Sequence, residues 1–135
     1  MKIAHIISGI ILLLLVSCGT VITGDSNESL KNQWVLQDNN QNQLGLNEEP
    51  ITISFGLEEA NKITGFAGCN YYGGNFSFNE NEISFSDIYS TKRACPDLDI
   101  ETEFFNLLNE VDNYEIKGNN LYLYKGKLLY LHFKK

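Results

Sequence analysis

Few side chains in this sequence could carry out catalysis. The chain of 135 residues contains two histidines, His5 and His132. Nucleophilic devices of the Ser–His–Asp or Cys–His kind need a histidine beside the nucleophile. His132 stands between Leu131 and Phe133, and the alternation of a strand puts it on the face opposite to theirs. We therefore expect a solvent-facing strand residue at this position and no catalytic residue in the chain.

Four carboxylates follow one another at alternate positions, and paired carboxylates can do acid–base chemistry: Asp97, Asp99, Glu101 and Glu103. Neighbours two apart on a helix do not share a face, which argues against such a pair. The positive end of a helix dipole attracts negative charge, and this explains the four residues without chemistry. No EF-hand spacing is present, so we expect no metal and no cofactor.

The same segment predicts one amphipathic helix over residues 96–111, with Pro96 at its first position. Its apolar positions are spaced by four, three, one and three, which is a helical stripe: Ile100, Phe104, Leu107, Leu108 and Val111.

Three cysteines offer sulfur chemistry. Leu15-Val16-Ser17-Cys18 resembles the bacterial lipobox, in which the thiol is acylated, and it follows Lys2 and an apolar run over residues 6–16. That run is shorter than the roughly 20 residues of a spanning helix, as is typical of a secretory signal. We expect a signal peptide over residues 1–17, a lipid on Cys18 and a flexible tether over 18–29. An inner-membrane retention signal would resemble an aspartate after the cysteine, and Gly19 at this position favours the outer membrane. We expect the domain at the periplasmic face of that membrane.

Cys69 and Cys95 then remain as an even pair in an oxidising compartment, which predicts a disulfide. A redox-active or metal-binding thiol pair is the alternative. The absence of a C-x-x-C motif and of a second histidine after the signal peptide argues against it.

The elements that position these residues are mostly strands. After the tether, apolar residues recur at every second position, as in Ile51, Ile53 and Phe55, and turn residues separate the runs. We expect one domain over residues 30–135, mainly β in an α+β arrangement. It would be a small antiparallel β-barrel or half-barrel of about eight strands with the helix packed on it. With 17 acidic against 10 basic residues and a net charge of −7, the chain does not suit nucleic acid. We expect a monomer.

Two blocks carry the most unusual spacing. The first is Gly65-Phe-Ala-Gly68-Cys69-Asn70, and the second is Thr91-Lys-Arg93-Ala94-Cys95-Pro96. They resemble the G-x-x-G-C-N and S-T-x-x-A-C-P blocks of META-domain, or HslJ-like, lipoproteins. The resemblance covers residues 30–134 and implies a small β-barrel-like domain, an envelope location and an association with heat shock or other stress in some members. It implies no enzyme activity. Arg93 stands where the family often has methionine, and it could instead bond an acidic neighbour.

Seven tyrosines are many for a domain of this size. They either cover a second packed layer or form an exposed aromatic patch for a ligand, with the candidate members Tyr71, Tyr72, Tyr122 and Tyr124. Two functions follow as hypotheses. The first is a non-catalytic envelope lipoprotein that binds a protein or a small ligand and supports envelope integrity or stress tolerance. The second is a periplasmic hydrolase with a site near Asn70, Thr91 and Arg93.

Overall fold

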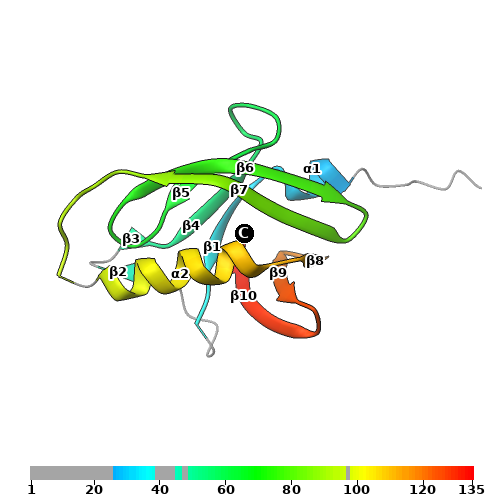
Figure 1. Cartoon of the computed structure of the whole chain (residues 1–135). Helices are drawn as coiled ribbons and strands as arrows, with labels where there is room; N and C mark the ends of the chain where they lie inside the picture. Colours follow the sequence, from blue (N-terminus) through cyan, green and yellow to red (C-terminus); the bar gives the residue numbers. More distant parts are fainter. Residues whose placement is uncertain (1–25, 39–44, 47–48, 97) are drawn as a thin grey trace, which may run out of the picture.

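The computed structural model describes residues 26–38, 45–46, 49–96 and 98–135. Within these residues, two helices and ten strands follow one another (Figure 1): α1 Ser26–Leu30, β1 Gln33–Leu36, β2 Gly45–Leu46, β3 Glu49–Pro50, β4 Thr52–Phe55, β5 Lys62–Phe66, β6 Tyr71–Asn79, β7 Glu82–Ser90, α2 Leu98–Glu110, β8 Asn113–Lys117, β9 Asn120–Lys125 and β10 Leu128–Lys134. Among the described residues, no helix has the length and apolar character needed to cross a bilayer.

Eight antiparallel strands form a ring-like sheet in the order β1-β10-β9-β8-β7-β6-β5-β4, and β1 closes the ring by pairing with β4. Strands β2 and β3 form a separate two-stranded sheet. The predicted fold class, mainly β with about eight antiparallel strands and one amphipathic helix, is confirmed. Most neighbouring strands are joined by short turns, which is the connection that antiparallel pairing allows.

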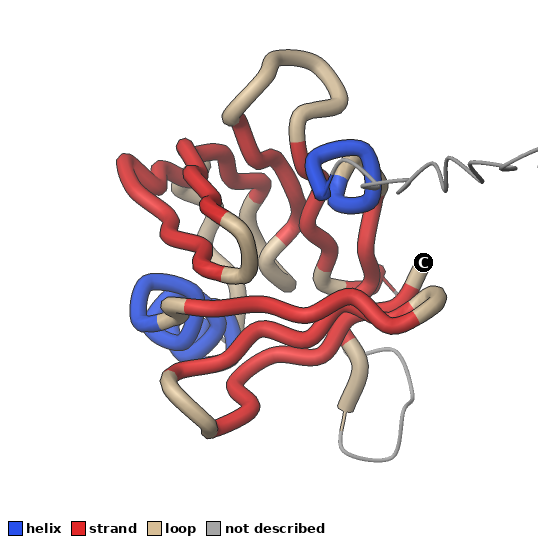
Figure 2. Tube along the Cα trace, turned by 90° about the vertical axis from the view of Figure 1, so that its right-hand side faces the viewer, coloured by secondary structure: helices blue, strands red, loops and turns tan. Residues whose placement is uncertain are grey.

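The ring is weakest between β7 and β8. Only Glu82 and Asn113 are paired across this junction, whereas β6 and β7 pair along most of their length. Helix α2 connects these two strands and packs against β7 and β10. In Figure 2 the helix lies beside the place where the two halves of the sheet separate. The helix thus covers an opening that strand pairing leaves in the ring.

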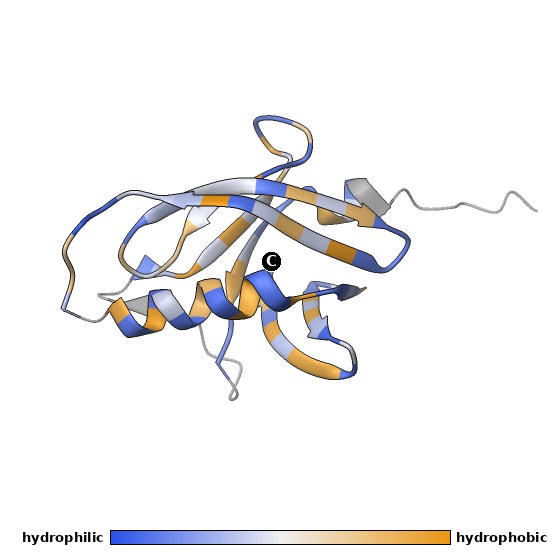
Figure 3. Cartoon of the chain, in the orientation of Figure 1, coloured by the Kyte–Doolittle hydropathy of each residue, from blue (hydrophilic) through white to orange (hydrophobic). Residues whose placement is uncertain are grey.

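The interior is filled by alternate side chains of the strands. Trp34, Phe55 and Phe133 are the largest fully buried side chains. Figure 3 shows hydrophobic and hydrophilic bands alternating along α2 and along β6 and β7. On α2, Phe104 and Leu108 point into this core. The period-two and helical patterns of the sequence therefore correspond to the buried faces.

Two boundaries differ from the prediction. Helix α2 begins at Leu98, so Pro96 lies before the helix and not at its first position. The disulfide at Cys95 ties the chain to the start of β6, and the helix begins only after that attachment. Residues 26–29, predicted to belong to the tether, are helical in α1. Leu30 is fully buried and its carbonyl oxygen accepts a 2.9 Å hydrogen bond from the indole of Trp34, which fixes this segment to the domain. The predicted signal peptide and Cys18 lie outside the described residues.

Candidate functional site

The two sequence blocks meet in space at the turn between β5 and β6. Cys69 and Cys95 form the predicted disulfide, with their Cα atoms 6.1 Å apart. The backbone amide of Ala67 donates to the carbonyl of Asn70 at 2.9 Å. Gly68 has a φ of 103°, a backbone angle that residues other than glycine rarely adopt. Thr91, Ala94 and Pro96 are exposed. Residues 66–70 of the first block are buried, and the second block is joined to them nearer the surface.

Gly65 lies where two strands and a tyrosine come close together. A Cβ atom at this position would overlap the carbonyl oxygen of Thr52 and stand 2.7 Å from the ring of Tyr72. The Tyr72 hydroxyl donates to that same carbonyl at 2.9 Å. Only glycine leaves room for this contact, so the first glycine of the block has a packing role.

Asn70 is the buried centre of a polar cluster. Its backbone N–H and its side-chain Nδ2 donate to the two carboxylate oxygens of Glu101, at 2.8 and 2.9 Å. Its Oδ1 accepts from the Thr91 hydroxyl at 2.8 Å and from the Arg93 backbone amide at 2.7 Å. We call Asn70, Thr91, Arg93 and Glu101 the Asn70 cluster. It fastens the second block and α2 to the turn before β6.

The structure brings together the three residues of the hydrolase hypothesis, Asn70, Thr91 and Arg93. Their contacts are internal, because the side-chain atoms of Asn70 are already engaged by protein groups. The three ion pairs among the described residues do not include Arg93. The arrangement is suited to holding chain segments in place.

Glu101 is the member of this cluster that the sequence interpretation missed. From the sequence, the helix dipole was sufficient to explain Glu101. In the structure its carboxylate is only 7% exposed and binds Asn70. A signal was available in the spacing: Glu101 lies three residues before Phe104 and seven before Leu108, so it shares the buried face of α2. A carboxylate within an apolar stripe predicts a buried polar partner.

Of the two arrangements that the sequence left open for the tyrosines, an exposed patch made of all four candidates is not formed. Tyr71 and Tyr72 are adjacent in β6 and therefore face opposite ways. Tyr72 is 4% exposed, and burial raises its pKa well above the usual value. Tyr71 is 54% exposed and donates to Glu49 at 3.1 Å, and that carboxylate raises the pKa of Tyr71. Tyr122 and Tyr124 lie on β9, which β7 and β8 separate from β6 in the ring.

His132 lies half-buried on the outer side of β10. Its ring stacks on Tyr122 with centroids 4.6 Å apart and planes inclined by 7°, and its Nε2 lies 2.9 Å from the Oδ1 of Asn120. Burial lowers the pKa of His132, and the nearby charge of Lys134 lowers it further. The residue faces away from Leu131 and Phe133 as predicted, but aromatic and amide neighbours cover part of it.

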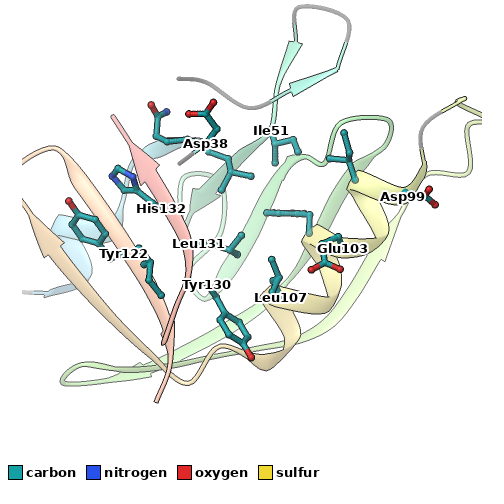
Figure 4. A pocket seen from close by; sticks show the side chains of 14 residues that line it. Asp38, Ile51, Asp99, Glu103, Leu107, Tyr122, Tyr130, Leu131 and His132 are labelled. Carbon is teal, nitrogen blue, oxygen red and sulfur yellow. The ribbon is translucent and has the colours of Figure 1, made fainter. Parts of the chain in front are cut away.

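A groove of about 760 Å³ runs between α2, β10 and the end of β1. Its apolar lining consists of Leu36, Ile51, Ile100, Phe104, Leu107, Leu129 and Leu131. Its polar lining consists of Gln37, Asp38, Asp99, Glu103, Tyr122, Tyr130 and His132. Figure 4 shows Leu107 of α2 and Leu131 of β10 facing each other across this space, with the Glu103 carboxylate beside them. The volume lies within the range of about 300–1,000 Å³ that small-molecule sites occupy.

Two features make the groove a candidate binding site. Leu129 remains 52% exposed although it lines the groove, so apolar surface is open to a ligand there. The Tyr130 hydroxyl donates to Glu110 at 3.0 Å across the gap between β10 and α2, and that carboxylate raises the pKa of Tyr130.

Sequence reasoning missed the groove because its lining residues come from segments far apart in the chain. In the described part of the chain, no three histidine, cysteine or acidic residues cluster as a metal site.

This ring of eight antiparallel strands, covered on one side by a helix and tied by a disulfide beside the two blocks, defines a class of small β domains. The sequence profile of the META domain matches residues 28–135, and the chain belongs to the META-domain family. No protein with a curated function is similar enough in sequence to count as a relative.

Solved structures share the fold. A protein known from an NMR structure is 23% identical, with a TM-score of 0.61 over 80% of this chain and 92% of its own. An NMR structure of a Burkholderia xenovorans protein is 21% identical, with a TM-score of 0.60 over 81% and 85%. A crystal structure of a DUF4847 family protein from Bacteroides vulgatus is 18% identical, with a TM-score of 0.55 over 78% and 92%. These likenesses concern the fold.

Proposed function

We propose that this protein is a non-catalytic lipoprotein of the bacterial envelope that binds a ligand with an apolar body in the groove between α2 and β10. The observation that carries the proposal is the groove itself. It has an apolar floor, a volume of about 760 Å³ and a lining leucine, Leu129, that is half exposed. Such a concave apolar site with a few polar groups is the usual form of a small-molecule site.

The contacts of the candidate catalytic residues support binding over catalysis. General acid–base chemistry needs a side chain within hydrogen-bond reach of the reacting group. The side-chain atoms of Asn70 are hydrogen-bonded to Glu101, Thr91 and Arg93. The Nε2 atom of His132 is engaged by Asn120. The groove offers shape and apolar surface, and these suit recognition.

The anchor follows from the sequence. Residues 15–18 resemble a lipobox, so the mature chain would start at a lipidated Cys18 and be held at the periplasmic face of the outer membrane. In this setting we propose that ligand capture supports envelope integrity or stress tolerance. Mass spectrometry of the mature N-terminus and membrane fractionation test the anchor. The Cys18→Ser variant is expected to lose acylation, and an acylated or membrane-retained variant would contradict this part.

Ligand binding is tested with the full lipidated chain in lipid nanodiscs, with leucine methyl groups labelled for NMR. Octanol serves as a neutral apolar probe, and its free concentration is measured in each sample. We expect the methyl signals of Leu107 and Leu129 to shift and saturate. The signal of Leu128, which is 66% exposed and does not line the groove, should not shift.

Two neighbouring leucines provide a matched pair of variants. Leu129→Asn should weaken octanol binding by about fivefold, since covering half a leucine contributes about 1 kcal/mol. Leu128→Asn changes a more exposed leucine outside the groove and should leave the affinity unchanged. Equal effects of the two substitutions, or no saturable shift in the parent chain, would refute the groove as the binding site.

A further inference from the structure

The polar groups around the groove share one electrostatic character. Three carboxylates line it, those of Asp38, Asp99 and Glu103. The other polar side chains of the lining are uncharged at neutral pH, and no lysine or arginine occurs among the described lining residues. The whole chain carries a net charge of −7. An apolar floor is thus bordered by negative charge.

Helix α2 forms the more acidic wall. Its sequence, LDIETEFFNLLNE, contains four acidic residues and no basic one. Asp99 and Glu103 are both exposed and lie four residues apart, so they are neighbours on the helix surface. Like charges at this spacing repel each other. Neither residue takes part in an ion pair among the described residues.

The C-terminal end of the helix places a further carboxylate beside the groove-lining Tyr130. Glu110 is the last residue of α2, where the helix dipole favours a cation over a carboxylate. The Tyr130 hydroxyl donates to it, but no basic residue lies in the last turn. At its C-terminal end the helix therefore carries a carboxylate that no basic residue of its last turn compensates.

We propose that the occupant of the groove is a small cationic amphiphile, with an apolar chain and an ammonium head. This inference rests on the proposed function and names the ligand class for the same site. The apolar chain lies between Leu107 and Leu131, which face each other (Figure 4). The ammonium group lies by Asp99 and Glu103 and relieves the repulsion between them. An anionic amphiphile is rejected, because its head group would be repelled by the carboxylates of Asp99 and Glu103.

The test compares three probes that share one eight-carbon chain: octyltrimethylammonium, octanol and octanoate. Each is titrated into the full lipidated chain in nanodiscs, with free probe measured and the Leu107 and Leu129 methyl signals recorded. We expect octyltrimethylammonium to bind about tenfold more tightly than octanol, because each exposed ion pair is worth up to about fivefold. The preference should shrink at high salt. Octanoate should bind more weakly than octanol.

Charge-neutralising variants locate the effect. The double variant Asp99→Asn and Glu103→Gln should lower the affinity for octyltrimethylammonium to that for octanol. The affinity for octanol itself should not change. Glu58→Gln removes an exposed carboxylate outside the groove and serves as the matched control. It should keep the full preference for the cationic probe.

The outcomes separate the two proposals. Equal binding of octanol and octyltrimethylammonium, or stronger binding of octanoate, overturns the ligand class and leaves the groove as a binding site. No saturable shift with any probe overturns both. The methyl signals of the groove could instead change with the number of chains per nanodisc and not with the probe. That result would assign the groove to a second copy of the chain and would overturn the proposal of an amphiphile. Preservation of the preference in the double variant also overturns it.

Discussion

The Asn70 cluster and the groove both use residues from the first half of α2 and differ in how their polar atoms are used. Within the cluster, the carboxylate of Glu101 and the side chain of Asn70 are bonded to each other and to neighbouring protein groups. At the groove, Asp99 and Glu103 are exposed and take part in no ion pair among the described residues. Buried, mutually satisfied groups stabilise a fold, whereas open groups beside an apolar floor are available to a ligand.

The contrast teaches that the most conspicuous sequence blocks need not be the functional site. The paired cysteines, Gly65 and Asn70 stand out in the sequence. The cysteines and Asn70 fasten the β5–β6 turn to the segment before α2, and Gly65 allows the close approach of Thr52 and Tyr72. The groove has no comparable signature. Variants of the cluster should therefore affect stability and not ligand binding, and variants of the groove the reverse.

The largest effect is expected from removing the disulfide. The double variant Cys69→Ala and Cys95→Ala should lose about 3–4 kcal/mol of unfolding free energy, since the bridge joins residues 26 apart in the chain. Denaturant unfolding measures this loss. The parent chain under reducing conditions should match the variant, and the variant should show no further change on reduction. An unchanged stability would contradict a structural role for the bridge.

Asn70→Ala should lower the unfolding free energy by about 3 kcal/mol, because it removes a donor from the buried carboxylate of Glu101 and leaves the Arg93 amide without its acceptor. Asn109→Ala, at an exposed position of the same domain on α2, is the matched control and should change stability by less than about 0.5 kcal/mol. Chemical denaturation of both variants provides the comparison. A loss of octanol binding in folded Asn70→Ala would break the separation between the two regions.

Gly65→Ala should cost about 2 kcal/mol through overpacking against the Thr52 carbonyl and the Tyr72 ring. Gly73→Ala is the matched control in the adjacent strand. There the added Cβ would meet only the far end of the Tyr89 side chain, which is 69% exposed and can move away. Thermal unfolding should therefore show a clearly larger decrease for Gly65→Ala, and equal decreases would contradict the close approach at Gly65.

A smaller effect concerns pH. The pKa of His132 is lowered in the folded state. As the pH falls below about 6.5, the usual pKa of a histidine in an unfolded chain, the unfolded chain therefore binds more protons than the folded chain. This group therefore stabilises the fold above that range, and the contribution falls as the pH decreases through it. Comparing the parent chain with His132→Gln at pH 7.5 and pH 5 isolates the contribution. The parent should lose more stability on acidification, and parallel losses would contradict burial of this ring.

The smallest effect is expected at the groove. Glu103→Gln removes the like-charge neighbour of Asp99 on α2, and this should raise the unfolding free energy by about 0.2–0.5 kcal/mol. Denaturant unfolding at low salt measures the gain, which should diminish at high salt. The same variant should weaken the binding of the cationic probe. A marked loss of stability would place Glu103 with the Asn70 cluster.

The fold was largely predictable from local patterns. Alternating apolar residues such as Ile51, Ile53 and Phe55 indicated strands that the structure contains, and the stripe through Phe104 and Leu108 indicated α2. The pairing of Cys69 with Cys95 also followed from their number. These signals are short-range, because burial of one face imposes a period of two on strands and of 3.6 on helices.

The candidate site was less predictable. For Tyr72 the sequence left both a packed layer and a surface patch open, and closure of the ring directs it toward Thr52. Glu101 was attributed to the helix dipole, but it meets Asn70, 31 residues earlier in the chain. The partner of a polar side chain depends on which strands become neighbours, and the residue's own surroundings in the sequence do not specify that.

By itself, the sequence determined the strand and helix patterns and the paired cysteines, since each of these leaves a local pattern or an even count. Only the tertiary structure decided that Leu107 of α2 and Leu131 of β10 face each other across an open groove with acidic borders. The physical reason is that a cavity is the space left between elements after they pack. Its walls come from residues that share no pattern until the ring has closed.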